Sequence, residues 1–178
     1  MADLLQVDIT DATSELTDAQ TQWLASNALA AGKRLRCTGQ VRVRVVNDAE
    51  MAQAHEEFAG VPGTTDVLTF DLREGRVYDP AIVLGPQFLL PDQNSGPTPI
   101  DTDIMVCIDE ARRQATARGY PFERELLLYV VHGVLHCLGL DDHDEGQFEA
   151  MHRLEDAVLE AVGVGAVFRV PPRADGVG

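Results

Sequence analysis

Hydrophobic and polar positions follow two different periods along the chain, and together they predict interleaved strands and helices. Apolar residues at every second position are typical of strands, whereas apolar residues three or four apart are typical of amphipathic helices. The interleaving does not follow a strict βαβ order, so we expect an α+β fold, a single domain with a small mixed β-sheet packed against helices. The expected strands are 4–9, 41–46, 66–70, 81–84 and 103–108, and the expected helices are 16–32, 48–58, 109–118, 121–138 and 145–162.

One predicted helix is apolar on nearly all sides, from Leu126 to Leu138. A helix of this kind must be buried, because it has no polar face to turn towards water. Pro121 precedes it and Gly139 follows it, as is common at helix starts and stops. Gly139 can adopt a left-handed conformation and let the chain fold back towards the helix.

Length and composition indicate one core. A chain of 178 residues with 45% apolar content can bury one good core but is short for two domains. We expect a single domain over residues 1–165, with a proline-rich loop at about 71–100 that holds five of the nine prolines. The residues 166–178 are expected to form a flexible tail.

Hydropathy, cysteine content and charge indicate the expected location and partners of the protein. No run is long enough to span a membrane and the N-terminus lacks a signal-peptide pattern, so we expect a cytoplasmic protein without a membrane partner. The three cysteines are widely spaced and are expected to be reduced and buried. A net charge of −15 argues against a simple nucleic-acid binder, and DNA is not an expected partner. However, Ala19–Asn47 has five basic and no acidic residues, so it is either a solvated surface or a phosphate-binding face.

The segment His132–His143, with the sequence HGVLHCLGLDDH, has the spacing of a metal site. His132 and His136 lie four residues apart on the buried helix, so their Cβ atoms are roughly 6 Å apart on one face. Two imidazoles without partners would be costly in apolar surroundings, which favours a metal over an ordinary core role. After Gly139, either His143 or Asp142 can supply a third ligand. Three protein ligands with a fourth position left for water are typical of catalytic zinc.

The residue after the first histidine separates this site from one large class of zinc enzymes. Peptidases with an HExxH motif have their general base there, whereas this chain has Gly133. A peptidase is therefore disfavoured. His55 and His152 lie on predicted helices without a comparable setting and are expected to be ordinary surface residues.

Three segments resemble the YbeY family of bacterial single-strand endoribonucleases. HGVLHCLGLDDH is similar to the family signature HGxLHLxGxDH, Thr65–Phe70 (TDVLTF) to its TDVLSF strand, and Asp103–Cys107 (DIMVC) to its GDIVIS-type strand. The resemblance implies an α+β metalloprotein in which His132, His136 and His143 hold one Zn²⁺ and take part in catalysis. It also implies cleavage of ribosomal RNA at the 3′ end of 16S RNA, ribosome quality control, and association with the small ribosomal subunit.

Two departures from the family pattern leave alternatives open. Asp142, rather than His143, stands at the offset of the family's third histidine. Many members have an arginine and a lysine before the TDVLSF strand, and the corresponding stretch here, Phe58–Val61, has neither. Arg42 and Arg44 are our candidates for the RNA-binding arginines. The alternatives to an endoribonuclease are a ribosome-associated RNA-binding assembly factor with a mainly structural metal, and a zinc hydrolase of another substrate.

Overall fold

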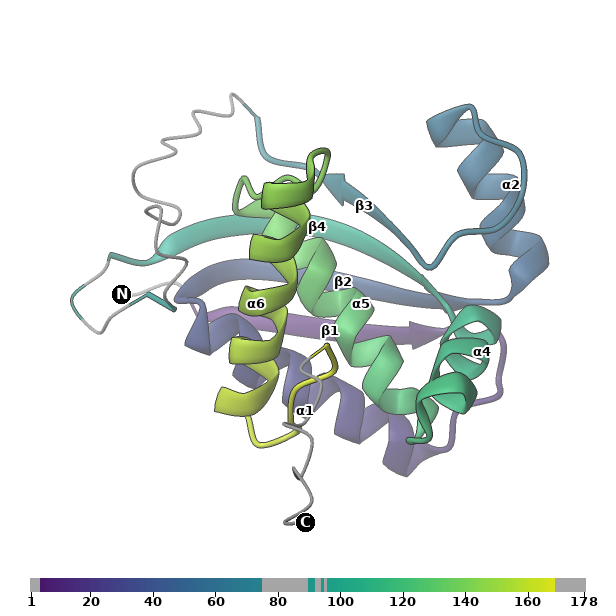
Figure 1. Ribbon diagram of the computed structural model, residues 1–178, viewed down its shortest axis with the longest axis horizontal. Helices are drawn as coiled ribbons and strands as arrows, with labels where there is room; N and C mark the ends of the chain where they lie inside the picture. The colour runs from purple at the N-terminus through teal and green to yellow at the C-terminus, as the bar shows by residue number, and fades with distance from the viewer. Residues whose placement is uncertain (1–3, 75–89, 92–93, 95, 169–178) are drawn as a thin grey trace, which may run out of the picture.

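The computed structural model describes residues 4–74, 90–91, 94 and 96–168, and its elements alternate as the sequence predicts (Figure 1). The α+β class, the small mixed sheet packed against helices and the burial of the helix that carries His132 and His136 are confirmed. The strands are β1 (Leu5–Asp11), β2 (Cys37–Val46), β3 (Val67–Asp71) and β4 (Thr98–Cys107), and the helices are α1 (Asp18–Arg34), α2 (Asp48–Ala59), α4 (Ile108–Arg118), α5 (Phe122–Cys137) and α6 (Glu145–Ala161).

The sheet is mixed, with the strand order β1-β2-β4-β3. β1, β2 and β4 run parallel, and β3 pairs antiparallel with β4 at one edge. β4 begins at Thr98, five residues before the predicted start, because it pairs along the whole of β2, from Cys37 opposite Thr98 to Val46 opposite Cys107. A prediction from apolar alternation missed this extension, because Ile100 is the one apolar residue among polar residues and a proline at 98–102.

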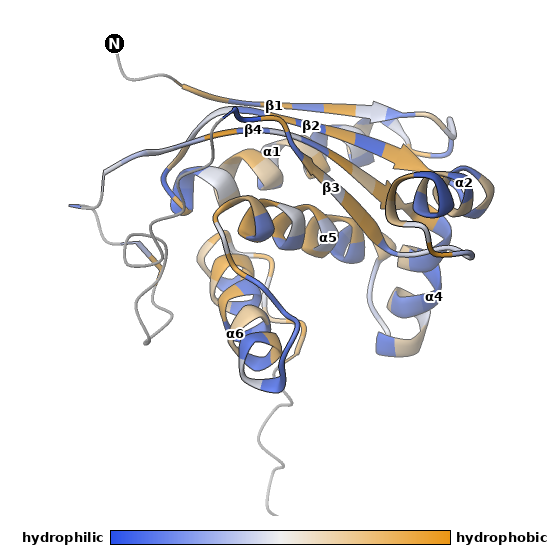
Figure 2. Ribbon diagram, turned by 90° about the horizontal axis from the view of Figure 1, so that it is seen from above, coloured by the Kyte–Doolittle hydropathy of each residue, from blue (hydrophilic) through white to orange (hydrophobic). Residues whose placement is uncertain are grey.

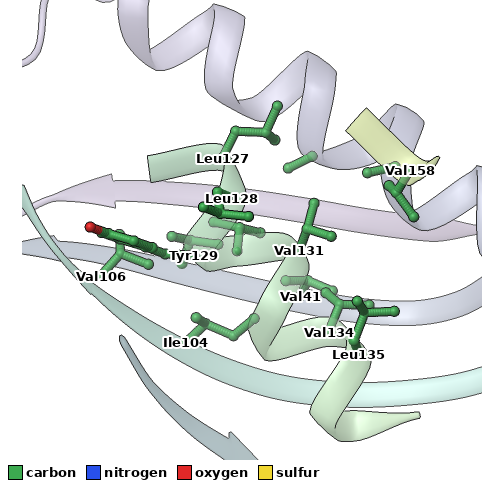
Figure 3. Packing of buried hydrophobic residues seen from close by; sticks show 14 of the residues in the cluster. Val41, Ile104, Val106, Leu127, Leu128, Tyr129, Val131, Val134, Leu135 and Val158 are labelled. Carbon is green, nitrogen blue, oxygen red and sulfur yellow. The ribbon is translucent and has the colours of Figure 1, made fainter. Parts of the chain in front are cut away.

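Helices α1, α5 and α6 lie on one side of the sheet, and in the part of the chain that the structure describes no helix covers the other face (Figure 2). Side chains that alternate along the strands point into this helical layer. Val41 and Ile104 of the sheet and Val134 of α5 belong to one hydrophobic cluster (Figure 3). Each of these three residues is at most 5% exposed. Burying one such side chain stabilises the fold by about 1.5–3 kcal/mol.

Gly133 lets α5 approach the sheet closely. A Cβ atom at this position would lie 2.8 Å from Thr69 Oγ1 of β3 and 2.9 Å from Ile104 Cδ1 of β4. The position that carries the glutamate in HExxH peptidases therefore faces the sheet here, and a larger side chain would push the helix away. The close approach also brings the two neighbouring histidines of α5 beside β3.

Capping residues lie at the helix ends, and Gly139 follows α5 as predicted. The side chain of Asn47 accepts a hydrogen bond from the backbone N–H of Glu50 at the start of α2. Gly119 follows α4 with a positive φ of 76°, and Gly139 follows α5 with a φ of 93°. The three cysteines are buried thiols, as expected.

Parts of the predicted domain organisation lie outside the described residues. The predicted strand at 81–84, most of the proline-rich loop and residues 169–178 of the predicted tail are among them. The start of that tail contacts α6: the backbone N–H groups of Val167 and Phe168 donate to Asp156 Oδ1 at 2.7 and 3.0 Å. Within the ranges described, no helix combines the length and the apolar character that a membrane crossing requires.

Candidate metal centre

The last two turns of α5 and the turn that follows bring three potential metal ligands together. His132 Nε2 and His136 Nε2 are 2.8 Å apart. Asp142 Oδ2 lies 3.7 Å from the first of these nitrogens and 3.9 Å from the second. The carboxylate reaches this position because the chain reverses at Gly139, whose N–H donates to the carbonyl of His136. The three ligand atoms lie within 4.8 Å of one another, a spacing that one ion can bridge.

The outer nitrogens of both rings are held by acceptors. His132 Nδ1 is 2.5 Å from Glu155 Oε1, and His136 Nδ1 is 3.0 Å from the carbonyl oxygen of Leu140. Because a carbonyl only accepts hydrogen bonds, His136 carries its proton on Nδ1, and the carboxylate of Glu155 favours the same tautomer for His132. In the neutral rings both Nε2 lone pairs then face each other and the Asp142 carboxylate. This arrangement requires a cation, either a proton or a metal ion.

Burial and charge act in opposite directions on this network. Burial raises the pKa of Glu155, but the hydrogen bonds from His132 and His152 outweigh it, so the pKa of this carboxyl is lowered overall. Burial likewise lowers the pKa of His132, but the hydrogen bond with Glu155 and the nearby charges of Glu155, Asp66 and Asp142 raise it further than burial lowers it. The surroundings of His132 therefore favour a positive charge on its own imidazole.

The donor set suits a transition metal such as zinc. Imidazole nitrogens bind zinc at about 2.0–2.1 Å and carboxylate oxygens at about 2.0–2.2 Å. Two nitrogens on one tetrahedral zinc ion are roughly 3.3 Å apart. Small rotations of the two rings, each already fixed at Nδ1, would adapt the observed 2.8 Å to this distance.

The structure brings His132 and His136 together as predicted, but it places Asp142, not His143, beside them. The His143 side chain is 84% exposed, and its Nε2 lies 3.2 Å from Asp141 Oδ1. Asp141, Asp142 and His143 also form a second group of potential ligands at the surface. The one-residue shift relative to the family signature thus puts the aspartate at the position nearest the histidine pair.

Two adjoining hollows meet at His132. The larger, of about 540 Å³, lies between α6, α4 and the loop before β3. The smaller, of about 320 Å³, runs along β3 past His136. Asp66 lines both, so the candidate ligands lie along a groove that a chain-like substrate could follow. We call the larger hollow the α6 cleft; its lining includes Asp66, Glu110, Arg118, His132, Asp142, Phe148, His152, Glu155 and Phe168.

Sequence reasoning missed Glu155 and treated His152 as an ordinary surface residue. Glu155 is 1% exposed and accepts hydrogen bonds from both His132 and His152, the second at 2.8 Å. His152 lines the α6 cleft and has only 24% of its side chain exposed. A usable signal was present: Glu155 lies beside Leu154 on the apolar stripe of α6, where a carboxylate needs a partner.

The arginines proposed for RNA binding lie on the other face of the sheet. Arg42 pairs there with Asp101 and Asp103, and Arg44 pairs with Glu50. Both line a hollow on the open face rather than the metal centre.

Among the described residues, two other arginines lie near the candidate metal centre, and the sequence analysis named neither. Arg118 lines the α6 cleft, where it pairs with the buried Glu125 at 2.6 Å. Arg73 donates to the carbonyl oxygen of Cys137, the residue after His136. Their positions depend on how α4 and the segment after β3 pack against α5. Local sequence patterns do not predict this packing.

Comparison of the chain with known proteins gives a consistent result over most of its length. The family model described as Endoribonuclease YbeY matches residues 6–163. A protein named Endoribonuclease YbeY from Desulfitobacterium hafniense is 37% identical over 125 residues, which cover 70% of this chain and 73% of that protein. Another of the same name from Halalkalibacterium halodurans is 31% identical and covers 90% of this chain and 97% of its own length.

A solved structure supports the fold. The solution structure of TM1509 from Thermotoga maritima matches with a TM-score of 0.51 and 23% sequence identity, and covers 88% of this chain and 89% of that chain. At this identity the likeness concerns the fold alone. The family match and the identities together show that this chain belongs to the YbeY endoribonuclease family.

Proposed function

We propose that this protein is a metal-dependent endoribonuclease that cleaves single-stranded RNA, with one Zn²⁺ held by His132, His136 and Asp142. One observation carries the proposal: in a chain of this family, two imidazole lone pairs and a carboxylate converge beside a groove. Asp142 takes the place that His143 has in the family-based expectation. Three ligands leave a further coordination position for water or substrate.

The residues around the site orient the proposed ligands for binding the ion. Glu155 and the Leu140 carbonyl hold both rings in the tautomer that presents Nε2 to the metal. The carboxylate of Asp142 offsets part of the ion's charge. When bound, the ion supplies a Lewis acid for a phosphate oxygen or activates water for attack on phosphorus. No covalent nucleophile is needed, and Arg118 is the arginine in the α6 cleft that can approach a phosphate.

The proposed biological substrate is the 3′ end of 16S ribosomal RNA, with a role in ribosome quality control and the small ribosomal subunit as partner. This part rests on the resemblance of the three sequence segments to the YbeY family. A polyanionic substrate is repelled by the overall charge of −15, so recognition depends on the metal and on local contacts.

The test is cleavage of a labelled single-stranded RNA that carries a 16S 3′ precursor, compared with the same RNA annealed to its complement. Zinc-loaded protein should cleave the single strand and spare the duplex. Chelation should stop cleavage, and added Zn²⁺ should restore it. His132→Ala should abolish both zinc binding and cleavage, whereas the control His55→Ala should keep both, because His55 lies on α2, outside the candidate centre.

Two results would contradict the proposal. Cleavage by His132→Ala at the wild-type rate would show that the candidate centre does not act in the reaction. Binding of the precursor without cleavage by zinc-loaded wild-type protein would instead favour an assembly factor whose metal is structural.

A further inference from the structure

Three aromatic rings form a column along one wall of the α6 cleft. Phe148 and His152 are four residues apart on α6, with ring centroids 4.1 Å apart and an edge-to-face angle of 71°. Phe168 also stacks on His152, with centroids 3.6 Å apart and an angle of 26°. The guanidinium of Arg118 lies over Phe168, 5.1 Å from the ring centroid. The column therefore joins α6, α4 and the segment after α6 at one place.

Two buried carboxylates of α6 hold the column in position. Glu155 accepts a hydrogen bond from His152 Nδ1, and Asp156 accepts two from the backbone at Val167 and Phe168. Both carboxylates are at most 2% exposed. The outer ring differs, since Phe148 is 49% exposed although it is a large apolar side chain at the cleft. A rigid support with an exposed outer ring is an arrangement suited to contact with a flat ligand.

We propose that Phe148, supported by His152 and Phe168, forms a platform on which one base of the RNA stacks next to the scissile phosphate. The inference rests on the proposed function and names how the substrate is held. Unstacked bases of single-stranded RNA commonly bind by stacking on aromatic side chains. The same cleft is lined by His132 and Asp142, so a nucleotide on the platform adjoins the metal centre.

The charges of the cleft favour a base over a phosphate at this wall. Among the described residues, the lining holds one arginine, Arg118, and five carboxylates, those of Asp66, Glu110, Glu125, Asp142 and Glu155. Carboxylates repel the phosphate backbone, whereas an uncharged base can lie against the rings without that penalty. The platform also gives a physical reason for a preference for single strands, because a base in a duplex cannot leave its stack without losing pairing energy.

The test compares Phe148→Ala with Phe148→Tyr and with the control Phe58→Ala. Phe58 is also exposed, at 61%, but it lines the hollow on the open face of the sheet. With zinc-loaded protein and a short single-stranded RNA, Phe148→Ala should raise KM about tenfold with little change in kcat, the effect of losing one stacked base. Phe148→Tyr and Phe58→Ala should behave like wild type. All variants should bind Zn²⁺ with wild-type affinity.

A second substrate identifies the stacked group. Replacing one base next to the cleavage site by an abasic sugar should raise the wild-type KM to that of Phe148→Ala, and the variant should lose nothing further. A KM of Phe148→Ala equal to that of the wild type would overturn the platform. The proposed function would still stand in that case, provided that the wild-type protein cleaves RNA. A weakened zinc affinity in Phe148→Ala would also overturn it, since the ring would then support the metal centre. Absence of RNA cleavage by the wild type would overturn both.

Discussion

Charged and ionisable side chains on the two sides of the sheet differ in how they are paired. On the open face, Arg42 is enclosed by Asp101 and Asp103, and Arg44 is paired with Glu50. On the helical side, His132 and His136 turn their Nε2 atoms towards each other and towards Asp142, while their Nδ1 atoms are held by other groups. The two arginines of the open face are paired within the protein, whereas the helical side leaves a place for a cation.

This difference shows that the pairing of charges matters more than their number. The basic segment of the sequence contains the arginines of the open face, yet their carboxylate partners leave little positive charge for a phosphate. Residues 141–160 contain eight carboxylates, and two of them, Asp142 and Glu155, lie at the candidate metal centre. An acidic region can thus support chemistry on an anionic substrate when it holds a cation.

Among changes that test this comparison, Asp142→Ala is expected to have the largest effect, a loss of zinc affinity. Loss of a direct ligand should lower zinc affinity by more than about 100-fold, beyond the 10–100-fold typical of losing a group that only orients a ligand. His143→Ala is the matched change one residue later, and its exposed ring should contribute less than about threefold. Isothermal titration with Zn²⁺ measures both. A larger loss in His143→Ala than in Asp142→Ala would return the third position to the histidine.

A smaller effect is expected from Glu155→Gln. The amide can still accept from His132 Nδ1, but it lacks the charge that favours the metal-binding tautomer, so zinc affinity should fall by about 10–100-fold. Glu149→Gln is the control, because Glu149 is exposed on the same helix and pairs with Arg153. Equal zinc affinities for the two variants would show that the buried carboxylate does not tune the centre.

The smallest effect is expected on the open face. Arg42→Ala removes a partly exposed ion-pair network, and it should lower the free energy of unfolding by about 0.2–1 kcal/mol. Cleavage of the single-stranded RNA should stay within about twofold of wild type, because Arg42 lies on the face away from the metal centre. Urea unfolding and a cleavage assay measure the two quantities. A tenfold loss of cleavage with an intact fold would place RNA on the open face after all.

Much of the fold could be predicted because its signals are local. The start at Pro121, the stop at Gly139 and the uniformly apolar stretch of α5 each depend on a few neighbouring residues. The histidine pair was predictable for the same reason, since a spacing of four fixes a shared helix face. The period of β2 also showed that Arg42 and Arg44 share one face. Which face of the sheet the helices cover depends on tertiary packing, so the sequence alone could not place these arginines relative to the histidine pair.

The parts of the site that were missed depend on contacts between distant segments. Glu155 reaches His132 from the following helix, 23 residues away. The choice between Asp142 and His143 depends on the turn after Gly139, where the Leu140 carbonyl accepts from His136. A shift of one residue in that turn exchanges an inward side chain for an outward one, and spacing alone does not determine it.

The most direct test of the central claim is a crystal structure of the zinc-loaded protein with anomalous diffraction data at the zinc edge. We expect one strong anomalous peak at about 2.0–2.2 Å from His132 Nε2, His136 Nε2 and a carboxylate oxygen of Asp142. A peak bound by His143 in place of Asp142, or no peak beside the histidine pair, would contradict the account.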